Sequence, residues 1–147
     1  MTREDKELLL KDLCARLPYG VKMNHIADDE HSPKTLIGVA KDMITLEGLG
    51  GYECVDVENY KPYLFPLSSM TEEQFAELKV FADLIYESDT LELVEWNDNY
   101  KTLEFWLEEV PSYCVIKVFD WLNKNHFDYR GLIEKRLAID ATYKNIY

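Results

Sequence analysis

The chain is poor in the residues on which several classes of protein depend. Its three cysteines, Cys14, Cys54 and Cys114, lie far apart and form no C-x-x-C pair, which argues against a zinc ribbon or a thioredoxin-like redox site. An odd number of isolated cysteines indicates free thiols in a reducing compartment. No apolar run approaches the roughly 20 residues that span a bilayer, and the charged N-terminus lacks the apolar core of a secretory signal. We therefore expect a cytoplasmic protein that has no contact with membranes.

Basic residues are also scarce. Lysine and arginine number 16 against 28 aspartates and glutamates, and the formal net charge is −12 at pH 7. A charge of this sign repels phosphate backbones, whose binding to proteins depends largely on cationic contacts. We expect no direct binding to nucleic acid. The same charge keeps a protein soluble and attracts basic partners.

The remaining composition is typical of one globular domain. The chain has 147 residues, of which 47% are hydrophobic and 30% are charged. A chain of this length buries roughly 68–70% of the surface that its unfolded form exposes, so its core needs no metal, cofactor or disulfide. Neither a repeat nor a linker is visible, and we expect a single domain over residues 1–147.

Helical periodicity is present in several stretches. They cover residues 3–16, residues 72–87, a segment that begins at Pro111 and carries Val115, Ile116, Phe119 and Leu122, and a short final helix over residues 129–137. Pro18 ends the first helix. Thr71 and Gln74 form a capping box at the start of the second, and Asp128 is placed to cap the last.

Alternation of apolar and polar residues predicts strands over residues 19–26, 35–40, 43–46 and 52–57. Residues 61–66 contain two prolines and are expected to be irregular. Residues 91–107 fit either a strand pair or a helix. The predicted fold is therefore α+β, with a small antiparallel sheet over roughly residues 19–57 packed against three or four helices.

Three segments carry a resemblance to other proteins. They are residues 17–22 (LPYGVK), residues 61–73 without Phe65 (KPYL and PLSSMTEE), and residues 126–135 (HFDYRGLIEK). Together they resemble a group of small uncharacterised proteins from gut anaerobic bacteria and their phages or mobile elements. The group has no assigned activity, so the resemblance implies a phage or mobile-element origin and no mechanism.

Two groups of residues have the chemical types of an active site or a metal site. His25, Asp28, Asp29, Glu30 and His31 include ligand types suited to zinc or manganese. Their spacing matches no rigid site, and a solvated loop explains the acids better, so we expect no bound metal.

Cys114, His126 and Asp128 are the residue types of a thiol nucleophile, its base and an orienting carboxylate. Cys114 lies on an apolar helix, where packing as a small hydrophobe is the better explanation. Residues 48–51 (GLGG) lack the lysine of a phosphate-binding loop and indicate a hairpin bend. We assign no catalytic residue, and we lean toward a protein that is not an enzyme.

Aromatic residues suggest the function that we favour. Ten tyrosines and three tryptophans are present, and these residue types are enriched at protein interfaces. We expect a non-enzymatic protein-interaction module that binds a host or phage protein through Tyr63, Asp128, Tyr129 and Arg130, which combine aromatic rings with a guanidinium. In the purely structural alternative, Asp128 caps a helix and Arg130 pairs with a nearby acid.

Two rival functions stay open. One is a small hydrolase or metal-dependent enzyme with an unrecognised site. The other is an acidic DNA-mimic inhibitor, because residues 87–110 hold eight acids and one base. Apolar residues alternate with these acids, however, and this pattern is more typical of a half-buried strand pair with a charged face.

Overall fold

The computed structural model describes residues 1–27, 32–82, 94–97, 102–105 and 112–147. Within these residues the α-helices are α1 (Arg3–Arg16), α2 (Glu72–Phe81) and α3 (Ser112–Lys124). Short 3-10 helices cover Leu17–Tyr19, Val57–Asn59 and Leu67–Ser69. The strands are β1 (Lys22–His25), β2 (Lys34–Ala40), β3 (Met43–Gly48), β4 (Gly51–Asp56), β5 (Tyr60–Pro66), β6 (Val94–Asn97), β7 (Thr102–Phe105), β8 (Phe127–Asp128) and β9 (Ile139–Asp140).

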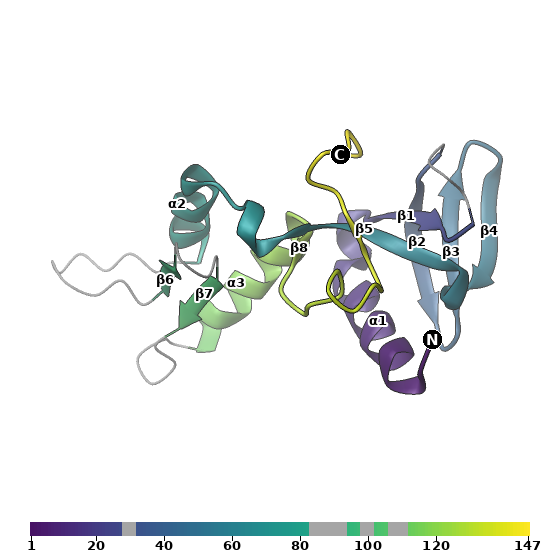
Figure 1. The fold of residues 1–147 in the computed structure, drawn as a ribbon, viewed down its shortest axis with the longest axis horizontal. Helices are drawn as coiled ribbons and strands as arrows, with labels where there is room; N and C mark the ends of the chain where they lie inside the picture. The colour runs from purple at the N-terminus through teal and green to yellow at the C-terminus, as the bar shows by residue number, and fades with distance from the viewer. Residues whose placement is uncertain (28–31, 83–93, 98–101, 106–111) are drawn as a thin grey trace, which may run out of the picture.

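The main sheet is mixed and has seven strands. Its order is β4-β3-β2-β1-β5-β8, and β9 also pairs with β5. Strands β1 to β5 pair antiparallel, whereas β8 and β9 run parallel to β5. The α+β class is confirmed. The antiparallel pairing predicted within roughly residues 19–57 is present in β1 to β4. The predicted small size is wrong, because β5 and the C-terminal strands β8 and β9 extend the sheet (Figure 1).

Strand β5 corrects the expectation that residues 61–66 are irregular. Pro62 pairs with Met23 of β1, and Pro66 pairs with Asp128 of β8. A proline lacks an N–H group but keeps a carbonyl acceptor, so it is tolerated where its missing donor is not needed. The donor at this end of β5 is Phe65, whose N–H reaches the carbonyl of His126 at 2.9 Å.

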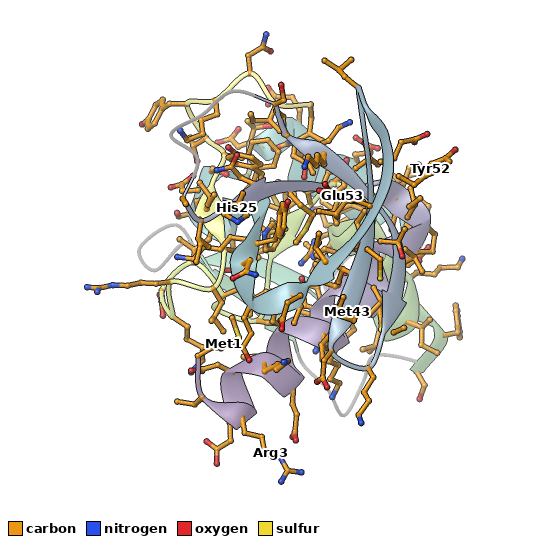
Figure 2. The ribbon with its side chains drawn as sticks, turned by 90° about the vertical axis from the view of Figure 1, so that its right-hand side faces the viewer. Met1, Arg3, His25, Met43, Tyr52 and Glu53 are labelled. Carbon is orange, nitrogen blue, oxygen red and sulfur yellow. The ribbon has the colours of Figure 1, made fainter. Side chains whose placement is uncertain are left out.

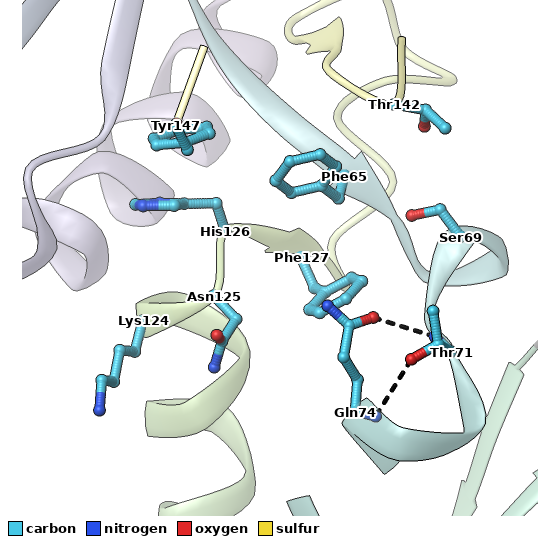
Figure 3. A pocket seen from close by; sticks show the side chains of 10 residues that line it. All are labelled: Phe65, Ser69, Thr71, Gln74, Lys124, Asn125, His126, Phe127, Thr142 and Tyr147. Carbon is cyan, nitrogen blue, oxygen red and sulfur yellow. Dashed lines mark hydrogen bonds between the residues drawn. The ribbon is translucent and has the colours of Figure 1, made fainter. Parts of the chain in front are cut away.

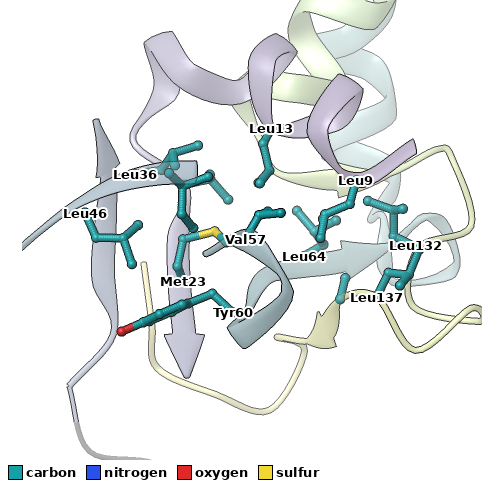
Figure 4. Packing of buried hydrophobic residues seen from close by; sticks show 13 residues of the cluster. Leu9, Leu13, Met23, Leu36, Leu46, Val57, Tyr60, Leu64, Leu132 and Leu137 are labelled. Atoms are coloured by element: carbon teal, nitrogen blue, oxygen red, sulfur yellow. The ribbon is translucent and has the colours of Figure 1, made fainter. Parts of the chain in front are cut away.

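Helix α1 covers one face of the sheet. It begins after Thr2, whose hydroxyl accepts a hydrogen bond from the N–H of Asp5 at 3.1 Å, and it has the predicted bounds. Its buried residues Leu9 and Leu13 pack into the first hydrophobic cluster (Figure 4). The buried members of this cluster are Leu9, Leu13, Val21, Met23, Leu36, Ile44, Leu46, Val57, Tyr60, Leu64, Leu132, Leu137 and Ala138.

A second hydrophobic cluster lies between α2 and α3. Its buried members are Met70, Leu78, Ala82, Cys114, Val118, Trp121, Leu122 and Phe127. The predicted capping box is present at the start of α2, where Thr71 and Gln74 exchange two hydrogen bonds. The described part of α2 ends at Phe81, and residues 83–87 of the predicted helix lie outside the described residues. Strand β5 connects the two clusters.

Strands β6 and β7 settle part of the ambiguous stretch. They pair antiparallel, with Val94 opposite Phe105 and Glu95 opposite Glu104. The strand-pair alternative is therefore confirmed for residues 94–97 and 102–105. Most of the acidic stretch from Glu87 to Glu109 lies outside the described residues, so the DNA-mimic hypothesis stays a prediction.

The predicted helix over residues 129–137 is wrong. The Asp128 carboxylate accepts hydrogen bonds from the N–H groups of Arg130, Leu132 and Ile133 at 3.2, 3.0 and 2.8 Å. The chain then turns through Gly131 (φ 70°) and Arg136 (φ 59°). These turns bring Leu132 and Leu137 into the first cluster.

Candidate functional site

The four predicted contact residues differ in exposure. Tyr63 is only 2% exposed and Asp128 is 8% exposed, whereas Tyr129 and Arg130 are half-buried. The backbone carbonyl of Tyr63 accepts a hydrogen bond from the Tyr147 hydroxyl at 2.8 Å. Tyr129 and Arg130 are thus the members of this set that have appreciable surface to offer a partner.

A buried cluster of charges lies beneath Tyr129. Arg16 and Asp12 form an ion pair at 2.7 Å with both side chains fully buried. Arg130 Nε lies 3.2 Å from Asp12 Oδ1, close enough for an ion pair, although its N–H is not aligned for a hydrogen bond. The guanidinium carbons of Arg16 and Arg130 lie 5.6 and 4.8 Å from the Tyr129 ring centre. One half of the structural alternative is present, since Arg130 lies beside the acid Asp12, whereas Asp128 binds backbone N–H groups of a turn and caps no helix. The partner-binding role of Tyr129 and Arg130 stays a prediction.

The three residues of the hypothetical thiol site, Cys114, His126 and Asp128, have separate environments and do not bind one another. Cys114 is fully buried in the second cluster. The Asp128 carboxylate is occupied by backbone N–H groups. His126 Nδ1 is buried and has no hydrogen-bond partner among the described residues, so Asp128 does not bind this ring nitrogen. The described residues therefore do not assemble a nucleophile, base and carboxylate from this set.

Most residues of the hypothetical metal site lie outside the part of the chain that the structure describes. Asp28, Asp29, Glu30 and His31 lie outside the described residues. His25 is described, and its Nδ1 accepts a hydrogen bond from the N–H of Ala27 at 3.2 Å. In the part of the chain that the structure describes, no three His, Cys, Asp or Glu residues are grouped to hold an ion. The helices of the same part are all too short or too polar to cross a membrane.

A polar cluster lies on the sheet and is satisfied internally. Glu53 accepts hydrogen bonds from the Lys34 ammonium and, at 2.9 Å, from the Tyr60 hydroxyl. These two bonds lower the pKa of Glu53, the lysine bond contributing most. The His25 ring meets the Tyr60 ring edge-on at 5.1 Å. Figure 2 looks onto this end of the sheet, where Glu53 and His25 lie. Lys34, Glu53 and Tyr60 thus bond to one another, and their side chains link strands β2, β4 and β5.

The remaining candidate is a cavity of about 450 Å³ at the end of α3 (Figure 3). Its size is within the range of small-molecule sites. The residues that line it are Phe65, Ser69, Thr71, Gln74, Lys124, Asn125, His126, Phe127, Thr142 and Tyr147. They come from β5, the start of α2, the end of α3, β8 and the C-terminal segment.

His126 is the most unusual residue of this cavity. Its backbone is left-handed (φ 59°), and its ring stacks on Tyr147 with centres 4.0 Å apart and planes 14° apart. Burial, followed by the nearby charges of Arg16 and Lys22, lowers the pKa of His126 to about 4. The imidazole is therefore neutral at pH 7.

Tyr147 fixes the C-terminal segment over the cavity. Its hydroxyl donates to the carbonyl of Tyr63 at 2.8 Å and accepts from the N–H of Lys22 at 3.1 Å. Burial is the main cause that raises the pKa of Tyr147, so the phenol stays neutral. These bonds hold the aromatic ring against His126.

The sequence points to His126 as a candidate residue, but it does not predict the cavity around this side chain. The residue type alone suggests only the role of a base for this histidine. The other walls come from segments up to 82 residues apart, as Phe65 and Tyr147 show. No local pattern brings such residues together.

Comparisons with protein-family models, curated proteins and solved structures give no significant match.

Proposed function

We propose that this chain is a cytoplasmic, non-enzymatic protein-interaction module of phage or mobile-element origin. The supporting observation is an apolar stripe on the outer face of α3. Ile116 is 69% exposed, Tyr113 is 53% exposed and Phe119 is 38% exposed. Apolar side chains that are exposed at successive turns of one helix face offer a surface on which another protein can pack.

The stripe continues into two of the predicted contact residues. The Phe119 ring packs on the Tyr129 ring with centres 5.0 Å apart, and Arg130 donates from Nη2 to the Tyr129 hydroxyl at 2.9 Å. Tyrosine and arginine are enriched among the residues that dominate binding energy. The buried contacts of Arg130 with Asp12 restrict this side chain before binding, which lowers the entropy lost on association.

The chemistry of the cavity favours binding over catalysis. Among its described lining residues there is no cysteine and no side-chain carboxylate. His126 is neutral, and within the described parts of the chain no group bonds its Nδ1 to orient it as a general base. A thiol hydrolase of the kind considered above would need a cysteine beside an oriented base.

The test compares two isoleucines that have similar exposure. The tagged protein is purified from its native cell, and bound proteins are identified by mass spectrometry. Ile116→Glu places a charge on the α3 stripe, whereas Ile26→Glu places the same charge beside β1, where Ile26 is 57% exposed. A partner retained by the wild type and by Ile26→Glu, but lost by Ile116→Glu, supports the proposal. Equal retention by both variants contradicts this interface, and the absence of any specific partner contradicts the module.

A further inference from the structure

The hydroxyl of Tyr147 is inserted at the place where the ladder between β1 and β5 ends. The last pair of this ladder is Met23 with Pro62, and on the same register Lys22 would face Tyr63. The Lys22 N–H donates to the Tyr147 hydroxyl at 3.1 Å, and this hydroxyl donates to the Tyr63 carbonyl at 2.8 Å. A side chain of the C-terminal segment therefore bridges the backbones of two strands.

The alternation of the ladder indicates that Lys22 and Tyr63 are a hydrogen-bonding pair. In an antiparallel ladder, every second pair of opposite residues exchanges backbone hydrogen bonds. Ile26, which belongs to the same alternate set as Lys22, donates to the Asn59 carbonyl at 2.9 Å. Pro62 has no N–H group and falls in the other set. The inserted hydroxyl thus holds a position that backbone atoms fill elsewhere in the ladder.

Aromatic rings surround the ring of Tyr147. It stacks on His126 with centres 4.0 Å apart and planes 14° apart, and its centre lies 5.9 Å from that of Phe65. Figure 3 shows the Tyr147 ring over the His126 ring, with Phe65 beside them. The place therefore matches both parts of a tyrosine, because side chains contact the ring while a backbone donor and a backbone acceptor bind the hydroxyl.

The segment that carries Tyr147 is anchored at both ends. The N–H of the buried Ala141 donates to the Leu64 carbonyl at 2.9 Å, and Tyr147 docks six residues later. Between these points the Lys144 N–H bonds within the segment, to Ala141 at 3.0 Å. Tyr143 is 98% exposed, and Tyr147 itself is 46% exposed. Segments that bury little surface open locally at a lower free energy than the whole fold.

We propose that residues 142–147 form a displaceable latch and that the place of Tyr147 is a binding site for a tyrosine side chain. When the latch opens, the Lys22 N–H, the Tyr63 carbonyl and the His126 ring are uncovered together. A tyrosine presented by a partner protein then takes the place of Tyr147, which in the closed state is an autoinhibitory ligand of the site. The latch also lines the cavity, so its opening widens the cavity on that side. This site does not rest on the α3 stripe.

Hydrogen exchange of the full chain tests whether the latch opens by itself. After correction for intrinsic rates, the Lys22 N–H should exchange at least about tenfold faster than the Leu36 N–H, which donates to the neighbouring Val21 carbonyl at 3.0 Å. Tyr147→Phe removes the acceptor and should accelerate Lys22 further. Tyr143→Phe makes the same change at an exposed ring of the latch and should alter neither amide. Equal protection of Lys22 and Leu36 in the wild type would overturn the proposal, because the latch would then open only with the whole fold.

Binding from solution is tested on Tyr147→Ala in the full chain. N-acetyltyrosinamide is titrated while the Lys22 amide is followed by NMR, and we expect a saturable shift at concentrations on the order of millimolar. N-acetylphenylalaninamide lacks only the hydroxyl. It should bind about tenfold more weakly, because it leaves the Lys22 N–H and the Tyr63 carbonyl without their shared partner.

The wild type is the matched control for this titration. It should bind N-acetyltyrosinamide more weakly than Tyr147→Ala does, because the tethered Tyr147 competes for the same place. Equal binding of the two probes, equal binding by the two proteins, or no saturable shift of Lys22 in the variant would overturn the proposal. Tyr147→Phe keeps the stacked ring and replaces the alanine variant if that chain does not fold. It too should bind the tyrosine probe more tightly than the wild type.

Discussion

Arg16 and Asp12 form a doubly hydrogen-bonded ion pair that has no contact with solvent. Nε and Nη2 of the arginine reach the two carboxylate oxygens at 2.7 and 3.1 Å, and both side chains are 0% exposed. Nη2 also donates to the carbonyl of Phe127 at 2.8 Å, which ties α1 to β8. Because Leu13 belongs to the first cluster and Phe127 to the second, this arginine joins the two.

Replacement of Arg16 should be strongly destabilising. Arg16→Met leaves the Asp12 carboxylate buried with only Arg130 nearby, and we expect a loss of about 3–5 kcal/mol in the free energy of unfolding. Urea denaturation measures it. The double variant Asp12→Leu with Arg16→Met should lose less than Arg16→Met alone, because no charge is then left unpaired. A larger loss in the double variant would contradict this explanation.

Asp128 should matter for stability through the backbone groups that it binds. Asp128→Ala leaves the N–H groups of Leu132 and Ile133 without their acceptor, and we expect a loss of about 2–4 kcal/mol. Asp128→Asn keeps an acceptor oxygen and should lose less. Denaturant midpoints distinguish the two. An alanine variant that is as stable as the wild type but loses the captured partner would instead support a contact role for Asp128.

The capping box should contribute measurably to α2. The Thr71 hydroxyl accepts from the N–H of Gln74 at 3.2 Å, and Thr71→Ala removes this acceptor. The expected loss is about 1 kcal/mol in the free energy of unfolding. Thr71→Ser keeps the hydroxyl and should stay close to the wild type. If the alanine and serine variants have the same denaturant midpoint, the cap does not stabilise the helix.

Stability should fall in mildly acidic solution because of His126. Its folded-state pKa of about 4 lies below the ordinary value of 6.5, so the unfolded chain binds this proton more readily between these two values. The contribution of the neutral imidazole to the free energy of unfolding is complete above pH 6.5. As the pH falls toward 4, the free energy of unfolding decreases by roughly 2–3 kcal/mol.

The matched variant for this prediction is His126→Asn, since asparagine tolerates a left-handed backbone better than most residues. Arg16, Lys22 and Tyr147 face the site in both proteins, and the many carboxylates titrate in both, so the difference between the two stability curves isolates the histidine. A difference that does not change between pH 4 and 6.5 would show that His126 titrates normally.

Local signals in the sequence were sufficient for the elements that depend on neighbours along the chain. Helix α1 has its cap and its periodicity within residues 2–16, and the β2–β3 and β3–β4 hairpins follow from alternation and a glycine bend. The start of α2 could be placed at Thr71 because both partners of its capping box lie within four residues. Such interactions are short-range, and their geometry is encoded in spacing.

Tertiary contacts decided the rest. Strand β5 forms despite its prolines because β1, β8 and β9 supply its partners in turn. Asp12 and Arg16 have the spacing of an exposed helix pair, and they are buried only because the chain around Phe127 covers that face of α1. The cavity has the same origin, since its walls come from several separate segments. Burial depends on which distant surface packs on a residue, and a residue's own neighbours in the sequence do not specify that surface.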